Sequence, residues 1–144
     1  MERRLRQLAV VIVAAALTAK LGGISSVSGF KFNPKTHVYV TNSLPKDTNM
    51  VIHCKSKDDD LGEHSIPYNQ TYTWSFHLNY SRSTLFWCRI GYWDAKAGRV
   101  VQGSFKMYEF VRDFGCTLHC FRFVQTDGIY FGKDRKVLKY QWPS

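Results

Sequence analysis

Apolar and polar side chains alternate strictly along residues 71–79. Every second position holds an aromatic or aliphatic residue, namely Tyr72, Trp74, Phe76 and Leu78, and the positions between them hold threonine, serine, histidine and asparagine. Successive side chains of a β-strand point to opposite faces of a sheet, so this pattern predicts a strand with one buried and one solvated face. On an α-helix the same aromatic residues would spread around the whole circumference.

Shorter alternating runs predict further strands. Apolar residues share one face in each of these runs: Val38 and Val40; Ile52 and Cys54; Phe86, Cys88 and Ile90; Val101, Phe105 and Met107; Leu118 and Cys120; Leu138, Tyr140 and Trp142. Asp127 and Gly128, between two apolar stretches, predict a tight hairpin turn because glycine adopts positive φ without steric cost. We expect an all-β fold, a small antiparallel β-sandwich, with an open barrel as the alternative because strand patterns alone do not determine closure.

The first 29 residues have the three parts of a secretory signal peptide. Three arginines within residues 3–6 precede an apolar run at residues 8–17, and small residues lead up to Gly29. Ten apolar residues in a helix rise about 15 Å, roughly half of the hydrocarbon core of a bilayer, so we expect no stable membrane insertion. The predicted cleavage follows Gly29, with Ala19 as the alternative, and leaves one domain at residues 30–144 of a secreted, extracellular protein.

The predicted mature chain is basic. The whole sequence holds 20 lysines and arginines and 11 acidic residues, and the leader contains four of the basic residues and one of the acidic ones, which leaves a net charge of +6. Such a charge favours acidic partners. However, the basic residues are scattered between Lys31 and Lys139 without forming a run, so we expect a solvated surface and no nucleic-acid partner.

Cys54, Cys88, Cys116 and Cys120 lie in the predicted mature chain. An even number of cysteines in an exported domain of this size predicts two disulfides. If residues 116–120 are extended, the Cα atoms of Cys116 and Cys120 lie about 13 Å apart, and their pairing would require a tight turn. The leading pairings are Cys54–Cys120 with Cys88–Cys116, which we favour, and Cys54–Cys116 with Cys88–Cys120. The sequence has no C-x-x-C motif and predicts no metal site.

Asp58, Asp59 and Asp60 are three consecutive carboxylates. Clustered carboxylates suit Ca²⁺, but adjacent side chains diverge and the spacing of an EF-hand loop is missing. We expect a turn that leaves the second strand, in which aspartate bonds its own backbone and Gly62 takes an unusual φ.

Two sequons flank the strand predicted at residues 71–79. They begin at Asn69 and at Asn79, and in a secreted chain they predict N-glycosylation of both asparagines. Both residues share the parity of the polar side of this strand, so each glycan would face water.

Catalysis by histidine is the enzymatic alternative. His53, His64, His77 and His119 could supply a general acid and a general base for a secreted nuclease. Nothing in the sequence places them together, and His53 and His77 fall on the predicted solvated side of their strands. The sequence also has no nucleophile elbow, zinc-protease motif or phosphate-binding loop. We therefore expect no enzyme, no catalytic residue and no cofactor.

The aromatic residues divide into two groups. Trp74, Phe76 and Phe86 share the parity of apolar partners and are expected in the core. The orientation of Trp87 and Trp93 is open, and either could be an exposed anchor for a partner.

Several segments together carry a family resemblance. They are H-C-K-S-K-D-D-D-L-G at residues 53–62, which includes Asp58, Asp59, Asp60, Leu61 and Gly62; Y-x-W-S-F from Tyr72 to Phe76; T-L-F-W-C ending at Cys88; the pair Cys116 and Cys120; D-G-I-Y from Asp127; and Y-x-W from Tyr140 to Trp142. With these segments, residues 38–142 resemble the plant self-incompatibility protein family, the S-protein homologues.

This resemblance implies a small secreted β-sandwich held by disulfides, with no known catalytic role. Founding members act as extracellular ligands that a receptor on pollen recognises, and specificity is thought to lie in variable loops. The corresponding loops here would include residues 44–49, 63–69 and 94–99. We therefore expect a secreted, non-enzymatic plant signalling ligand of the self-incompatibility type, recognised by a cell-surface receptor through its loops. A secreted basic defence module that binds cell wall or membrane is the alternative.

Overall fold

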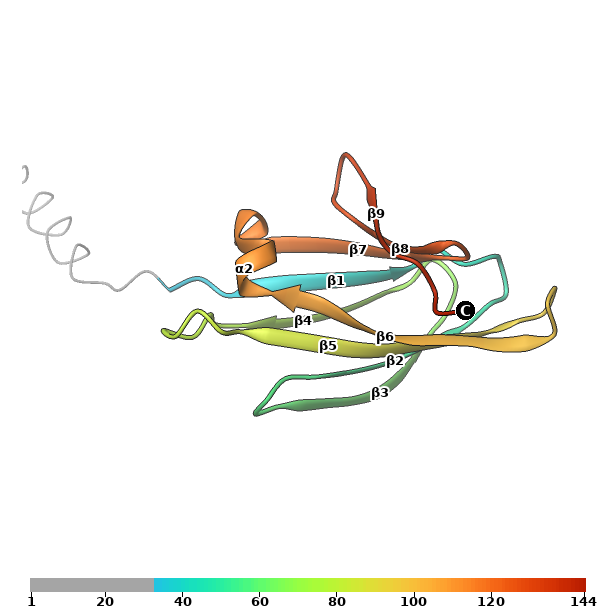
Figure 1. Cartoon of the computed structure of the whole chain (residues 1–144), viewed down its shortest axis with the longest axis horizontal. Coiled ribbons are helices and arrows are strands. Elements are labelled where there is room, and N and C mark those ends of the chain that lie inside the picture. The colour runs from blue at the N-terminus through green and yellow to red at the C-terminus, as the bar shows by residue number, and fades with distance from the viewer. Residues whose placement is uncertain (1–32) are drawn as a thin grey trace, which may run out of the picture. The chain divides into compact units, whose positions relative to one another are not determined.

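The computed structural model describes residues 33–144, whose nine strands form two sheets packed face to face (Figure 1). Pro34–Ser144 form one compact unit. The predicted signal peptide at residues 1–29 lies outside the described residues. Within the described part, no helix has the length and apolar character needed to cross a bilayer. The two separately hydrogen-bonded sheets confirm the predicted β-sandwich.

Each sheet combines strands that are distant in sequence. The five-stranded sheet has the order β4 (Thr71–Phe76), β1 (Thr36–Asn42), β7 (His119–Gln125), β8 (Gly128–Phe131) and β9 (Val137–Tyr140). The four-stranded sheet has the order β3 (Asp60–Ile66), β2 (Met50–Lys55), β5 (Leu85–Asp94) and β6 (Arg99–Glu109). A one-turn helix, α2 (Phe110–Asp113), and a 3₁₀ turn, η1 (Phe114–Cys116), connect β6 to β7.

Strand direction departs from the expected pattern at one pair of strands. All pairs are antiparallel except β1 and β7, which run parallel with His37 opposite His119 and Asn42 opposite Val124. Parallel neighbours need a long crossover, and here the chain between them forms the whole of the other sheet as well as β4. No pattern local to either strand predicts this pairing.

Two strand boundaries differ from the sequence expectation. The strand predicted at residues 71–79 ends at Phe76, although its alternation is confirmed by exposed Thr71, Thr73 and Ser75 on one face and buried Trp74 on the other. Residues 63–66, expected in a loop, belong to β3. The sequence pattern did not predict β3, because an edge strand with mostly exposed side chains lacks the apolar alternation of the inner strands.

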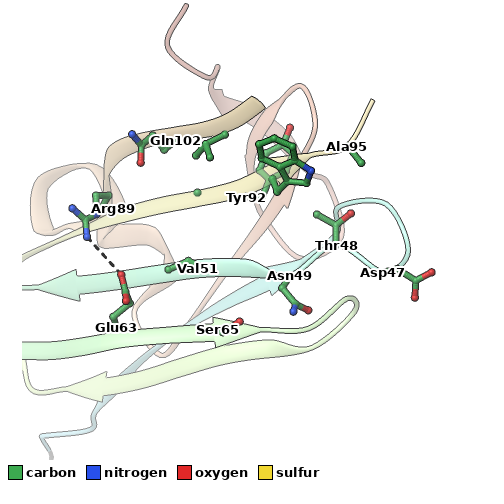
Figure 2. Close-up of a pocket in the computed structure, with 13 residues that line it drawn as sticks. Asp47, Thr48, Asn49, Val51, Glu63, Ser65, Arg89, Tyr92, Ala95 and Gln102 are labelled. Atoms are coloured by element: carbon green, nitrogen blue, oxygen red, sulfur yellow. Dashed lines mark ion pairs between the residues drawn. The ribbon is translucent and has the colours of Figure 1, made fainter. Parts of the chain in front are cut away.

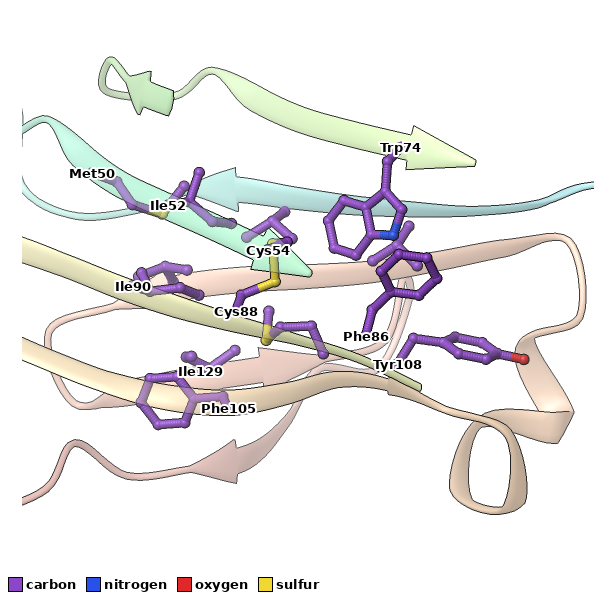
Figure 3. Packing of buried hydrophobic residues seen from close by; sticks show 14 of the residues in the cluster. Met50, Ile52, Cys54, Trp74, Phe86, Cys88, Ile90, Phe105, Tyr108 and Ile129 are labelled. Carbon is purple, nitrogen blue, oxygen red and sulfur yellow. A yellow bond between two sulfur atoms is a disulfide. The ribbon is translucent and has the colours of Figure 1, made fainter. Parts of the chain in front are cut away.

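The core lies between the two sheets and is made by the inward positions of their strands (Figure 3). Trp74 is 8% exposed and Phe86 is 4% exposed, and their ring centroids lie 5.8 Å apart. Phe76 packs against Phe86 at 4.6 Å between centroids. All three residues were predicted in the core: Trp74 and Phe86 are buried there, and Phe76 is half-buried against it. Aromatic pairs of this kind join the sheets mainly through the apolar area that they bury.

The predicted disulfide pairings are wrong. The structure joins Cys54 to Cys88 and Cys116 to Cys120. Cys54 and Cys88 lie directly opposite each other on β2 and β5, with their Cα atoms 4.0 Å apart. The prediction disfavoured the Cys116–Cys120 bridge because an extended chain would hold these residues too far apart, but η1 ends at Cys116 and β7 begins only at His119. The resulting bend brings these two Cα atoms to 5.3 Å, within the normal range for a disulfide.

The hairpin predicted at Asp127 and Gly128 is confirmed. Residues 126–127 form the turn, and Gly128 pairs with Gln125 at the start of β8. Gly128 has a φ of +150°, and a Cβ built on it would lie 2.0 Å from the carbonyl oxygen of Tyr140. Glycine is therefore required both by the backbone conformation and by the close approach of the chain that leaves β9.

A buried charge cluster holds α2 against the five-stranded sheet. Asp113, 7% exposed, lies 2.8 Å from Nη2 of Arg112 and 3.3 Å from Nη2 of Arg122, and its carboxylate accepts a hydrogen bond from the backbone N–H of Glu109. Arg122 is 3% exposed, and its guanidinium lies 3.6 Å from the ring centroid of Phe131. Burial lowers the pKa of Arg122 to about 10. One carboxylate thus faces two guanidinium groups in the interior.

Candidate functional site

A groove with a volume of about 730 Å³ lies on the outer face of the four-stranded sheet (Figure 2). Three chain segments form its rim. The segments contribute Asp47, Thr48 and Asn49; Glu63 and Ser65; and Ala95. These residues come from the three segments expected to determine specificity, 44–49, 63–69 and 94–99, although Glu63 and Ser65 belong to β3 rather than to a loop. We refer to this hollow as the recognition groove.

The floor of the groove is a row of paired residues across the sheet. Strand register places Val51, Gly91 and Gln102 side by side on β2, β5 and β6, and the rim residue Ser65 lies next to Val51 on β3. Gly91 presents no side chain, and a Cβ built there would lie 3.1 Å from Cβ of Gln102. The missing side chain therefore keeps the floor open at its centre.

Exposed apolar side chains lie on this floor and next to it. Trp93 is 57% exposed, and its register neighbour Val100 is 58% exposed. Val51 is 40% exposed. An exposed tryptophan beside two exposed valines is typical of an anchor for a protein partner. The sequence left the orientations of Trp87 and Trp93 open. Trp93 proves exposed, whereas Trp87 is half-buried and lines a different hollow.

Charge lies at the other end of the groove. Nη2 of Arg89 is 3.6 Å from Oε1 of Glu63, and the side chains of both residues are about 60% exposed (Figure 2). An ion pair this exposed contributes little to stability. The Arg89 guanidinium and the Glu63 carboxylate can therefore give up this ion pair and form ion pairs with a partner instead.

A smaller hollow of about 370 Å³ lies at the opposite end of β2 and β5. The hairpin between β2 and β3 supplies Asp58 and Asp59, and the residues after β4 supply His77 and Asn79. Within residues 33–144, no group of three or more histidine, cysteine or acidic side chains is arranged to hold a metal ion.

The carboxylates at residues 58–60 form a turn stabilised by local hydrogen bonds. The backbone N–H of Asp59 donates to Oγ of Ser56, and that of Gly62 donates to Oδ1 of Asp60. Gly62 has a φ of +78°, in agreement with the turn expected from the sequence. The hydrogen bond from Gly62, and after it the bond with His53, lowers the pKa of Asp60. The aspartates thus have a structural explanation.

Both sequon asparagines are exposed and lie beyond opposite ends of β4. The backbone N–H of Asn69 donates to the carbonyl of Asn42 at 2.9 Å. The side chain of Asn79 is bonded to Ser83: its Oδ1 accepts from the backbone N–H at 2.9 Å, and its Nδ2 lies 3.2 Å from Oγ. Glycosylation of Asn69 and Asn79 stays a prediction.

The histidines do not gather into one site. His53 lies on the outer side of β2 and His119 on the outer side of β7, so they face away from each other on different sheets. His64 packs on Tyr72, with 4.7 Å between their ring centroids. A pairing that sequence reasoning missed is that of His37 with His119, at 5.4 Å between centroids. The parallel register of β1 and β7 brings these two histidines together, and no pattern within either strand predicts the pair.

Comparison with known proteins agrees with this architecture. The family model described as plant self-incompatibility protein S1 matches residues 37–142. The chain is 36% identical to S-protein homolog 24 of Arabidopsis thaliana over 106 residues, which are 72% of this chain and 67% of that protein. It is 34% identical to S-protein homolog 8 of the same plant over 122 residues, 81% of this chain and 87% of that protein. The match to S-protein homolog 29 has 45% identity and spans 50% of that relative.

A solved structure has the same fold. It represents the SPH (self-incompatibility protein homologue) proteins, described as a widespread family of small, highly stable, secreted proteins from plants. The TM-score is 0.57 at 16% sequence identity, over 78% of this chain and 97% of that structure. With a matching family model over nearly all of the described sandwich, the chain belongs to the plant self-incompatibility protein S1 family.

Proposed function

We propose that this protein is a secreted, non-enzymatic signalling ligand that a cell-surface receptor recognises through the recognition groove. The observation that carries the proposal is the convergence of residues from three separate segments, 44–49, 63–69 and 94–99, around one open floor. Secretion is supported by the leader-like composition of residues 1–29 and by the description of the SPH relatives as secreted.

A groove on a rigid sheet suits recognition without large rearrangement. Its floor uses neighbouring strands β2 and β5, which are paired along their length and joined by the Cys54–Cys88 disulfide. Loops on such a scaffold have little conformational freedom left to lose when a partner binds. Exposed Trp93 supplies the kind of aromatic contact that dominates the binding energy of protein interfaces.

Binding of the labelled, processed protein to plant cells tests this proposal. We expect saturable binding that is lost when residues 44–49 or 94–99 are exchanged for those of a relative. Exchange of Asp134 and Arg135, two exposed residues in the turn before β9 on the other sheet, is the control and should leave binding unchanged. Binding that follows net charge alone, disappears in moderate salt and ignores the loop exchanges would contradict the proposal.

A basic module that binds a membrane surface is the second candidate. Val111 is 82% exposed, Phe114 is 64% exposed and Leu118 is 42% exposed, all on the segment that links β6 to β7. Exposed apolar groups on a cationic protein favour attachment to anionic lipid. Sedimentation with phosphatidylserine vesicles tests this function: loss of binding in Phe114→Ala supports it, and absence of vesicle binding by the wild type excludes it.

A further inference from the structure

We infer that the outer face of the five-stranded sheet is a binding site for an acidic polysaccharide, with uronic acid sugars as the chemical class of ligand. This site is separate from the recognition groove, which lies on the outer face of the other sheet. Its existence does not depend on a receptor.

Outward side chains of β1 and β7 place five rings on one face of the sheet, here called the aromatic face: His37, Tyr39, His119, Phe121 and Phe123. The ring centroids of Tyr39 and Phe121 lie 4.9 Å apart in a stacked arrangement. The hydroxyl of Tyr39 and Nδ1 of His119 are hydrogen-bonded at 3.0 Å. Rings held in this way offer apolar contact to the C–H faces of sugar rings at low entropic cost.

Hydroxyl groups border this face on one side. Thr71, Thr73 and Ser75 on β4 are exposed and point to the same side of the sheet, opposite Thr41, Tyr39 and His37. Oγ1 of Thr41 lies 2.8 Å from Oγ1 of Thr71. A hydroxyl both donates and accepts hydrogen bonds, so this row matches the hydroxyl groups of a polysaccharide.

Cations border the aromatic face on the other side. Nζ of Lys133 lies 5.6 Å from the ring centroid of Phe121, and Nζ of Lys136 lies 3.9 Å from that of Phe123. Among the described residues, β4, β1 and β7 contain no aspartate or glutamate. Two carboxylates lie nearby: that of Asp127 is hydrogen-bonded to the hydroxyl of Tyr130, and that of exposed Asp134 lies in the same turn as Lys133, Arg135 and Lys136, which outnumber it. The charge of this face therefore complements an anion.

A hollow of about 370 Å³ lies at the edge of the aromatic face, between η1 and the turn that follows β8. It is lined by Leu118, His119, Phe121, Arg122 and Lys133, among others. Arg122 is 3% exposed and is paired with Asp113 at 3.3 Å, so the cation that this hollow offers to a ligand is the exposed Lys133. The hollow can take a carboxylate while the attached sugar ring lies against Phe121. Cations, rings and a row of hydroxyls together favour an extended acidic sugar polymer over a lipid headgroup.

Isothermal titration calorimetry with a purified oligogalacturonate tests the inference. The same oligosaccharide in fully methyl-esterified form is the matched uncharged probe, because it keeps the backbone and loses the carboxylates. We expect the acidic form to bind and the ester to bind at least about tenfold more weakly, since the charge-assisted contacts with Lys133 and Lys136 are lost.

Two double variants, each of which removes two positive charges, distinguish a specific site from attraction by the net charge of the protein. Lys133→Gln with Lys136→Gln should weaken binding about tenfold or more. Lys55→Gln with Lys106→Gln removes two exposed lysines that flank Trp87 on the four-stranded sheet, and should change affinity by less than about twofold. Phe121→Leu should weaken binding without any change of charge. Thermal melts of all variants report on folding.

Three results would overturn the inference. The first is equal loss of affinity in both lysine double variants, which would indicate attraction by net charge. The second is equal binding of the acidic and esterified probes. The third is tight binding to phosphatidylserine vesicles with no binding to the oligogalacturonate, which would assign the face to a membrane surface.

Discussion

Cys54 and Cys88 face each other on adjacent strands of one sheet, with their Cα atoms 4.0 Å apart. The second bridge, Cys116–Cys120, closes the turn that enters β7. Within the described chain, therefore, no disulfide joins the two sheets. The packed core between the sheets holds them together. The Cys54–Cys88 bridge instead links β2 and β5, two strands that form the floor of the recognition groove.

The two disulfides should contribute unequally to stability. In the chain-entropy model the bridge with a sequence separation of 34 contributes about 4 kcal/mol, and the bridge with a separation of 4 contributes about 2 kcal/mol. We expect urea denaturation to show a larger loss for Cys54→Ala with Cys88→Ala than for Cys116→Ala with Cys120→Ala. Peptide mapping without reduction should yield these two pairs, and recovery of a peptide that joins Cys54 to Cys120 would contradict the structure.

Asp113 should be among the most sensitive charged positions in the fold. Asp113→Ala leaves Arg112 and Arg122 in the interior without their shared carboxylate, and we expect a loss of about 3–5 kcal/mol in the free energy of unfolding. Adding Arg122→Met should recover part of this loss, because it removes the more deeply buried of the two charges. Asp127→Ala, at an exposed carboxylate, is the control and should cost less than about 1 kcal/mol. Equal effects at Asp113 and Asp127 would refute the assigned role.

Two buried or half-buried tyrosines should respond differently to loss of the hydroxyl. The hydroxyl of Tyr140 donates to the carbonyl of Lys106 at 3.1 Å and accepts from Nη1 of Arg112. Tyr108 is fully buried, and its hydroxyl has no hydrogen-bond partner among residues 33–144. Chemical denaturation should show a loss of about 1–2 kcal/mol for Tyr140→Phe and no loss, or a gain, for Tyr108→Phe. A larger loss at Tyr108 than at Tyr140 would contradict this assignment.

Asp60 should titrate below its ordinary pKa of 3.8, because its carboxylate accepts hydrogen bonds from the backbone of Gly62 and from His53. A lowered folded-state pKa means that the ionised group stabilises the fold above 3.8, and that this contribution is lost as the pH falls through the folded-state pKa. Carbon-13 NMR titration of the carboxyl group measures it directly. His53→Ala should raise the pKa of Asp60 only part of the way, since the bond from Gly62 remains. A wild-type pKa at or above 3.8 would disprove the assignment.

Local pattern predicts much of this fold. The alternation around Trp74 and Phe76 identifies β4 and its buried face, because the pleat imposes a period of two. Asp127 and Gly128 mark the hairpin of β7 and β8 for an equally local reason, the backbone conformation of glycine. Variable loops were expected at residues 44–49, 63–69 and 94–99, and residues from all three segments line the recognition groove.

Sequence patterns did not predict the features that depend on packing between distant segments. The Cys116–Cys120 bridge requires the bend of η1, where the chain turns from β6 toward β7. The charge cluster depends on α2 folding back so that Asp113 meets Arg122 on β7. Gly91 is an ordinary glycine in sequence and becomes the floor of a groove only once β2 and β6 lie beside β5. In each case the deciding contact joins elements that the local pattern does not relate.

The central claim, recognition of a cell-surface receptor through the groove, is tested most directly by one comparison of dissociation constants on plant cells. Trp93→Ala removes an aromatic side chain that is 57% exposed inside the groove, and Phe114→Ala removes one that is 64% exposed outside it. We predict at least about a tenfold loss of affinity for Trp93→Ala, as for an interface anchor, and less than about a twofold change for Phe114→Ala. Unchanged binding of Trp93→Ala, with both variants folded, would contradict the account.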